Sequence, residues 1–171
     1  MRTTPLPAAH QRHLRAGRSS EPLACYAITK CVEGRLRVLA NDSSAAAILI
    51  SLNWLREHDH IKLLAFCMMP DHYHCLFVLL HNKSLKQSID SVSKFTATTI
   101  NASLDRKGQL WQEGFHDHRC RDNDDVLDRL TYIEHNPVRA ELAKNAADWT
   151  YSSAFPGNSR CLDRAWYAER C

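Results

Sequence analysis

Apolar residues follow two different spacings along the chain, and these spacings predict the order of its elements. Four short segments have apolar residues at alternate positions or at nearly every position, as β-strands do. Three longer segments have apolar residues three or four apart, which is typical of amphipathic helices. The predicted strands are residues 23–30, 60–69, 72–80 and 110–120, the last interrupted by Gly114, and the predicted helices are residues 41–57, 84–104 and 122–142.

Turn and cap residues support these boundaries. Residues 41–44 offer good helix caps, and Pro70 with Asp71 forms a turn that should join the second and third strands into a hairpin. Pro137 disfavours helical geometry at Asn136, so the last helix is expected to end or kink there. The order predicts an α+β fold of the ferredoxin-like βαββαβ type, with a central antiparallel sheet and an additional C-terminal helix.

The length of 171 residues allows one domain with a substantial core. Residues 1–20 contain four arginines and few large apolar groups, so they are interpreted as a basic, poorly ordered arm. The folded domain is expected over residues 21–155, and residues 156–171 are interpreted as a C-terminal tail. The apolar runs are too short to span a membrane and no signal peptide is visible, so a cytoplasmic protein without membrane contact is expected.

Cysteines and net charge restrict the possible classes only weakly. The seven cysteines are scattered without any CxxC pair, which favours free thiols over a disulfide scaffold or a structural zinc knuckle. The net charge of +3 neither requires nor excludes a nucleic-acid partner.

A pair of histidines is the first candidate for chemistry. His72 and His74 lie two apart in a predicted strand, so they share one face, while Tyr73 and Cys75 point to the other. In most strands such a pair is simply part of a half-exposed polar face. Two imidazoles also make only half of a metal site, so other residues must complete it.

The second candidate group is YIEHN, residues 132–136, in the last predicted helix. Tyr132 and Asn136 are four apart and project together, with His135 beside them. A phenol, an amide oxygen and two imidazoles can converge if this helix lies across the histidine strand. Taken alone, Tyr132 fits a core or interface position better, and Asn136 before Pro137 is a natural helix terminator.

Four motifs occur in one order: MMPDHYH, LWQEGFHDH, YIEHNPVRA and ADWTYSSA. Over about residues 25–154 the chain resembles the single-tyrosine HUH transposases of the insertion-sequence 200/605 type, and most of all the REP-associated tyrosine transposases. The resemblance implies an enzyme that cleaves and rejoins single-stranded or hairpin DNA through a covalent 5′-phosphotyrosine. Residue by residue, it implies that His72 and His74 hold a divalent metal, that Asn136 is the third protein ligand, and that Tyr132 is the nucleophile.

The residue types suit this chemistry. A metal on a nonbridging phosphate oxygen neutralises developing charge, and two imidazoles with one amide oxygen leave coordination positions open. This ligand set suits Mg²⁺ or Mn²⁺ as the cofactor. Tyr73 departs from the family pattern, in which an aliphatic residue separates the histidines. Strand alternation assigns Tyr73 to packing.

Basic side chains provide candidates for contact with a single-stranded or hairpin DNA partner. Lys94 and Arg139 are favoured, and Arg119 and Arg121 are further candidates. Two alternatives stay open: a domesticated protein that recognises palindromic DNA without cutting it, and a metal-dependent hydrolase of small substrates. Monomer and homodimer are both compatible with the sequence.

Overall fold

Four antiparallel strands form one sheet in the order β2-β3-β1-β4, in a computed structural model that describes residues 20–170. The strands are β1 (Cys25–Cys31), β2 (Ile61–Met69), β3 (His72–Leu79) and β4 (His116–Arg119); the helices are α2 (Asp42–Glu57), α3 (Leu85–Ser103), α4 (Asn123–Arg139) and α5 (Arg164–Ala168). This order and these connections are those of a βαββαβ unit followed by α4, so the predicted fold is confirmed. The basic arm predicted over residues 1–20 lies outside the described residues except for Ser20.

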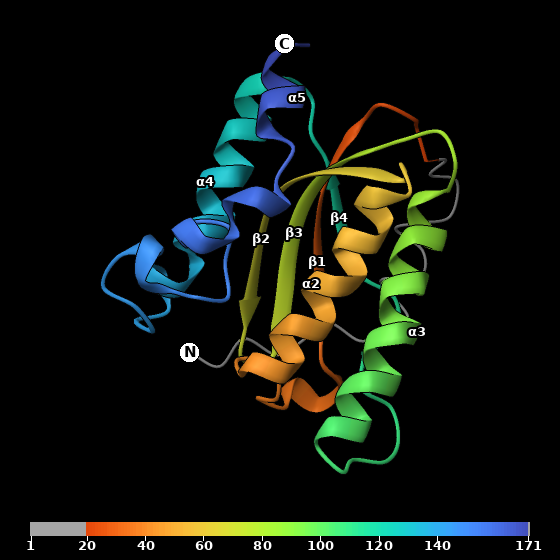
Figure 1. Cartoon of the computed structure of the whole chain (residues 1–171), viewed down its shortest axis with the longest axis vertical. Coiled ribbons are helices and arrows are strands. Elements are labelled where there is room, and N and C mark those ends of the chain that lie inside the picture. The colour runs from red at the N-terminus through yellow and green to blue at the C-terminus, as the bar shows by residue number, and fades with distance from the viewer. Residues whose placement is uncertain (1–19, 171) are drawn as a thin grey trace, which may run out of the picture.

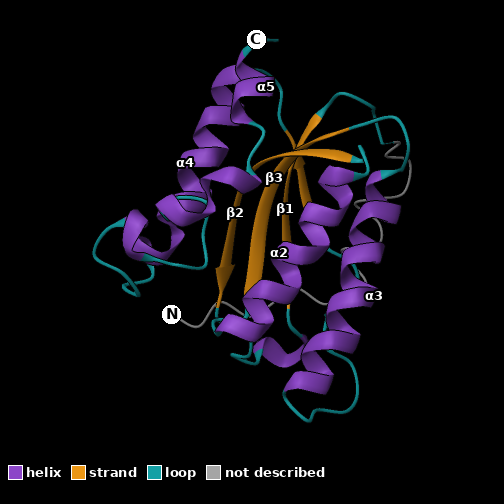
Figure 2. Ribbon diagram, viewed as in Figure 1, coloured by secondary structure: helices purple, strands orange, loops and turns teal. Residues whose placement is uncertain are grey.

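Helices cover both faces of the sheet. Helices α2 and α3 pack side by side on one face, and α4 lies across the other, against β2 and β3 (Figure 1, Figure 2). Strand alternation divides the core accordingly. Tyr73 and Cys75 of β3 are buried under α2 and α3, whereas Leu76 and Val78 belong to the cluster beneath α4. His72 and His74 have the parity of Leu76, so they belong to the face that α4 covers.

The last strand is shorter than predicted. Residues 110–120 were expected to form one interrupted strand; the structure has β4 from His116 to Arg119 and one isolated bridge between Trp111 and Val32. Between these two pieces, Gly114 has a φ of 72°. The Lys30 ammonium donates hydrogen bonds to the carbonyl oxygens of Gln112, at 2.6 Å, and Gly114. These carbonyls are therefore satisfied by a side chain rather than by a neighbouring strand.

The sequence predicted that helix α4 ends or kinks at Asn136, and the structure shows that it does not end there. It continues through Pro137 to Arg139. Proline has no N–H, so the carbonyl of Ile133 lacks its usual helical donor. The side chains of Ile133 and Pro137 are buried, and the Pro137 carbonyl accepts from the backbone N–H of Leu142 at 2.8 Å. Packing and this closing bond accommodate the proline.

Residues 156–170, interpreted from the sequence as a tail, pack against the sheet. They contain a 3₁₀ helix (Pro156–Cys161) and α5, and the segment leading to them runs along the edge of β2. The backbone N–H of Met68 donates to Tyr151 O, Ser153 N–H donates to Phe66 O, and Asp163 N–H donates to Leu63 O, at 2.8–2.9 Å. This segment therefore satisfies backbone groups that an edge strand would leave unpaired.

Two smaller expectations can be compared with the described part of the chain. The cysteines resolved between residues 20 and 170 are free thiols. No helix in this range is both long enough and apolar enough to cross a membrane.

Candidate active site

His72 and His74 face one another at the start of β3. Their Nε2 atoms are 3.1 Å apart, and the two rings meet edge to face. Each ring is held from behind through Nδ1. His72 Nδ1 lies 2.6 Å from an Asp71 carboxylate oxygen, and His74 Nδ1 lies 2.8 Å from the Thr29 hydroxyl on β1. Asp71 in turn forms an ion pair with Arg35 at 2.9 Å.

These partners direct the lone pairs of the two rings. A carboxylate can only accept, so His72 carries its proton on Nδ1 and presents an unprotonated Nε2. The Thr29 hydroxyl can accept from His74 Nδ1–H, which leaves His74 Nε2 unprotonated as well. Orientation of ligand imidazoles by a carboxylate or hydroxyl behind them is typical of metal sites.

Burial keeps both imidazoles neutral. It lowers the pKa of His72, even though the Asp71 carboxylate acts in the opposite direction. Burial, reinforced by His72 and by the Arg35 and Arg139 guanidinium groups, lowers the pKa of His74 to about 3. Neutral imidazole is the form that binds a metal ion.

The pair fits a metal ion. Two nitrogens bound at about 2.1 Å to one ion, at an angle of about 90–110°, lie about 3.0–3.4 Å apart. The observed separation of 3.1 Å falls in this range. When both rings carry their proton on Nδ1, the two Nε2 lone pairs face each other, and a metal ion bound between them would stabilise this arrangement.

Tyr132 projects from α4 toward this end of the sheet, and Asn136 lies one helical turn further along α4. The Tyr132 ring lies edge-on to His74, with 6.0 Å between centroids, and its residue is 42% exposed, so the phenol is accessible. The Asn136 side-chain amide donates from Nδ2 to the carbonyl of Tyr132 at 2.9 Å. Only the NH₂ end can donate to a carbonyl, so Oδ1 is left as an acceptor or ligand.

The four basic residues expected to bind DNA occupy three different places. Arg139 lies at the site, with its guanidinium carbon 4.5 Å from the centroid of the Tyr132 ring. Arg119 forms an ion pair with Glu21 at 2.6 Å, and Arg121 forms one with Asp125 at 3.3 Å, near the start of α4. Lys94 is exposed on α3, which covers the opposite face of the sheet. The structure therefore brings only Arg139 together with Tyr132.

Sequence reasoning missed a group of polar residues beside Tyr132. A pocket of about 120 Å³ between β1, β4 and α4 is lined by His74 and Tyr132 together with His116, His118 and Arg129. His116 and His118 pair with Thr29 and Ala27 of β1, so they share the face that carries His74. The sequence contains a sign of this group, because FHDH (residues 115–118) has two histidines two apart, as HYH (residues 72–74) does.

One group of three metal-capable side chains occurs among residues 20–170: His118, Cys120 and Asp125, with ligand atoms within 4.8 Å of one another. The Asp125 carboxylate in this group already accepts from His118 Nε2 at 2.9 Å and forms ion pairs with Arg121 and Arg129. Cationic partners around a carboxylate disfavour a second cation. The His72 and His74 pair is the better candidate for a metal.

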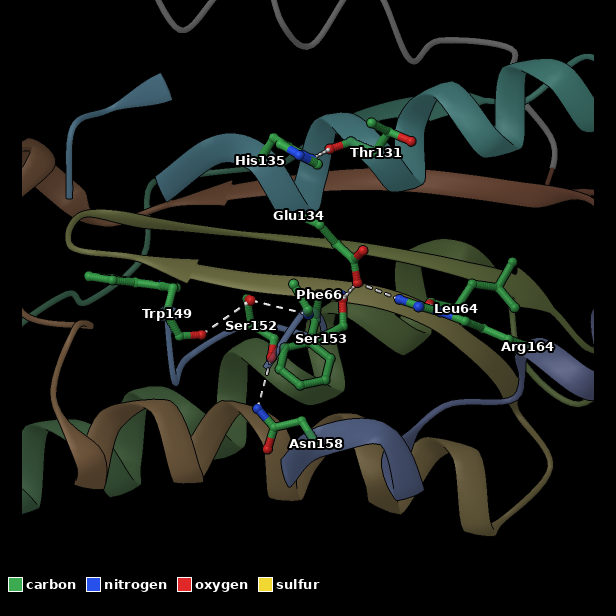
Figure 3. Close-up of polar contacts among 11 residues, drawn as sticks. Leu64, Phe66, Thr131, Glu134, His135, Trp149, Ser152, Ser153, Asn158 and Arg164 are labelled. Atoms are coloured by element: carbon green, nitrogen blue, oxygen red, sulfur yellow. Dashed lines mark hydrogen bonds and ion pairs between the residues drawn. The ribbon is translucent and has the colours of Figure 1, made fainter. Parts of the chain in front are cut away.

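A partly buried ion pair fixes α4 beneath the C-terminal segment. Glu134, two residues after Tyr132, accepts from the Ser153 hydroxyl at 2.7 Å and from the Arg164 guanidinium (Figure 3). Ser153 Oγ also accepts from the backbone N–H of Phe66 at 3.1 Å, and Arg164 Nε donates to Leu64 O at 2.9 Å. Both partners of Glu134 are thereby fixed to β2.

The family model described as "Transposase IS200 like" matches residues 23–136, two thirds of the chain. The chain belongs to the IS200-like transposase family. The matched segment begins just before β1 and ends at Asn136, so it includes all four residues of the candidate site. This confirms the family resemblance seen in the sequence motifs.

Relatives within the family carry a more specific name. The chain is 31% identical over 107 residues to a REP-associated tyrosine transposase of Haemophilus influenzae, an alignment that covers 57% of this chain and 61% of the relative. It is 26% identical over 91 residues to the REP-associated tyrosine transposase of Escherichia coli, covering 52% of each. The chain thus spans between half and two thirds of the length of these curated relatives.

A solved structure supports the fold. The structure of a REP-associated tyrosine transposase bound to a REP hairpin matches with a TM-score of 0.66 and 21% identity, over 85% of each chain. At 21% identity, this likeness shows that the two proteins share a fold.

Proposed function

We propose that the chain is a metal-dependent DNA transposase that cleaves and rejoins single-stranded or hairpin DNA through a covalent link between Tyr132 and a 5′ phosphate. The observation that carries the proposal is the meeting of two distant segments: His74 on β3 and Tyr132 on α4, with ring centroids 6.0 Å apart. A phenol that served only for packing would have no need of two oriented, neutral imidazoles beside it.

His72 and His74 would hold the divalent metal through Nε2, with Asn136 Oδ1 as the third protein ligand. Mg²⁺ or Mn²⁺ would neutralise charge on a nonbridging oxygen of the scissile phosphate. Asp71 and Thr29 would keep both rings oriented through Nδ1. The low pKa of both histidines means that protons do not compete for the ligand nitrogens at neutral pH.

In cleavage, Tyr132 Oη forms a bond to phosphorus while the bond from phosphorus to the 3′ oxygen breaks. The phenol loses its proton to solvent, and the departing 3′ oxygen gains one from solvent, so a 3′ hydroxyl is released. In rejoining, a 3′ hydroxyl attacks the phosphotyrosine and restores the phenol. Arg139, whose guanidinium lies over the Tyr132 ring, would supply positive charge on this side of the site in both directions.

The proposal of a DNA partner is supported by basic side chains and by the likeness to a solved structure. A protein with the same fold is described as bound to a REP hairpin. Arg139 is the first candidate for contact with the cleaved strand, and Arg119, Arg121 and Lys94 are proposed to contact more distant phosphates.

The proposal is tested by incubating the protein with end-labelled hairpins that carry single-stranded tails from beside its own gene. With Mg²⁺ or Mn²⁺, a labelled adduct should survive denaturing electrophoresis, and chelator should abolish it. His74→Ala should also abolish it, whereas His81→Ala, at an exposed histidine between β3 and α3, should not. Binding of DNA without any adduct would instead identify a recognition protein that does not cut.

A further inference from the structure

The pocket beside Tyr132 contains polar residues that have no role in the proposed cleavage reaction. His116, His118 and Arg129 line it together with the two site residues Tyr132 and His74. Asp117 is the one acidic residue in the lining, but it pairs with Ile28, whose side chain is in the core under α2 and α3. By strand alternation the Asp117 side chain belongs to that opposite face. The face toward α4 therefore presents imidazoles, the Tyr132 phenol and the Arg129 guanidinium.

A single buried carboxylate holds two of these side chains, His118 and Arg129, in place. Asp125, whose side chain is 4% exposed, accepts from His118 Nε2 at 2.9 Å and from the backbone N–H of Arg121 at 3.1 Å, and it pairs with Arg129 Nε at 3.5 Å. The hydrogen bond from His118, more than any other contact, holds the pKa of Asp125 well below its usual range. The carboxylate is therefore ionised at neutral pH and orients both His118 and Arg129.

Arg129 retains donors for a ligand. Its ion pair with Asp125 is made through Nε, and its side chain is 40% exposed. The terminal nitrogens of the guanidinium form a planar fork that suits phosphate oxygens. The pocket volume of about 120 Å³ is far below the roughly 300–1,000 Å³ of sites for drug-sized ligands, and it corresponds to about four water volumes. It can therefore take a group of about the size of a phosphate.

We propose that this pocket is a second phosphate subsite, in which Arg129, positioned by Asp125, binds the phosphodiester next to the one that Tyr132 attacks. The inference rests on the proposed function and adds to it a residue that sets where the strand is cut. One phosphate at Tyr132 and a second one in this pocket would define the path of an unpaired strand past the nucleophile. A regular duplex could not follow that path into a narrow pocket beneath α4.

The experiment measures binding of the tailed hairpin in chelator, where it is not cut. Each phosphate within three positions of the cleavage site is replaced in turn by an uncharged methylphosphonate. At the position next to the scissile phosphate, the replacement should weaken binding by the unmodified protein about tenfold, the value of one charge-assisted hydrogen-bonded contact. Arg129→Gln should weaken binding of unmodified DNA by a similar factor, and the methylphosphonate should then have no further effect.

Control variants distinguish the loss of this contact from the effect of removing any positive charge and from misfolding. Arg160→Gln, at an exposed arginine of the 3₁₀ helix, should leave the methylphosphonate effect unchanged. Arg129→Lys keeps the charge opposite Asp125 but loses the fork, and it should show a smaller loss than Arg129→Gln. The inference is overturned if every methylphosphonate weakens Arg129→Gln and the unmodified protein equally. Failure of the proposed function would appear differently, as the absence of any adduct in the unmodified protein.

Discussion

Removal of Glu134 should loosen the helix that carries Tyr132. Glu134→Ala deletes the acceptor of two hydrogen bonds, one from the buried Ser153 hydroxyl and one from the Arg164 guanidinium. The Glu134 side chain is 13% exposed and that of Arg164 is 40% exposed, so solvent screens the ion pair in part. We expect a loss of about 2–4 kcal/mol in unfolding free energy, between the value of an exposed pair and that of a fully buried one.

A double-mutant cycle isolates the ion pair. Glu134→Ala, Arg164→Ala and the double variant are unfolded in urea and followed by tryptophan fluorescence, and the expected coupling energy is about 1–2 kcal/mol. The matched control is the Lys86 and Asp90 pair on α3, whose side chains are 78% and 57% exposed, with an expected coupling of about 0.3–0.5 kcal/mol. A coupling for Glu134 and Arg164 no larger than that of the α3 pair would refute the conclusion that the C-terminal segment anchors α4.

Three further predictions concern the histidine strand. Asp71→Asn should weaken Mn²⁺ binding in calorimetry at least about tenfold without unfolding the chain, because His72 loses the carboxylate that orients it; unchanged affinity would contradict this. Tyr73→Phe should leave the free energy of unfolding unchanged or raise it by up to about 1 kcal/mol in urea, because the Tyr73 hydroxyl is buried and has no hydrogen-bond partner among residues 20–170. A loss above about 1 kcal/mol would contradict this. In chelator, stability should fall by up to several kcal/mol as the pH drops from about 6.5 toward 3, because His74 stays neutral in the folded state, with a pKa of about 3, while the unfolded chain binds the proton. In urea titrations at pH 7 and pH 4.5, His74→Gln should reduce the difference in unfolding free energy between the two pH values. The same difference in His74→Gln and the unmodified protein would contradict the role given to His74.

Much of the site could be predicted because alternation in a strand is a strictly local property. His72 and His74 share one face, and Tyr73 lies under α2 and α3, as the period of two requires. The spacing of four likewise placed Tyr132 and Asn136 on one side of α4. Family resemblance supplied what spacing could not, namely that this helix lies across this strand.

Long-range contacts account for what the sequence did not reveal. FHDH shows that His116 and His118 share a face, but only the pairing of β4 with β1 places them beside Tyr132. The preference of the residue before a proline for non-helical geometry is a local effect, and burial of Pro137 in α4 overcomes it. Lys94 illustrates the same limit, because helix periodicity does not say which face of the sheet a helix covers.

The C-terminal segment was hidden for a different reason. Several of its contacts with β2 join backbone groups, such as Ser153 N–H to Phe66 O and Asp163 N–H to Leu63 O, and these contacts leave no pattern in the side chains. Its two buried serines, Ser152 and Ser153, also look polar and exposed in the sequence. Edge-strand pairing of this kind can be read only from the folded chain.

The identity of the nucleophile is tested most directly by mass spectrometry of the trapped adduct between protein and DNA. After protease and nuclease digestion, the peptide containing Tyr132 should carry the residual nucleotide, and Tyr132→Phe should yield no adduct while it still binds the hairpin with nearly unchanged affinity. A nucleotide on Tyr73, Tyr151 or any residue other than Tyr132 would contradict the assignment of the nucleophile and the geometry of the site built around it.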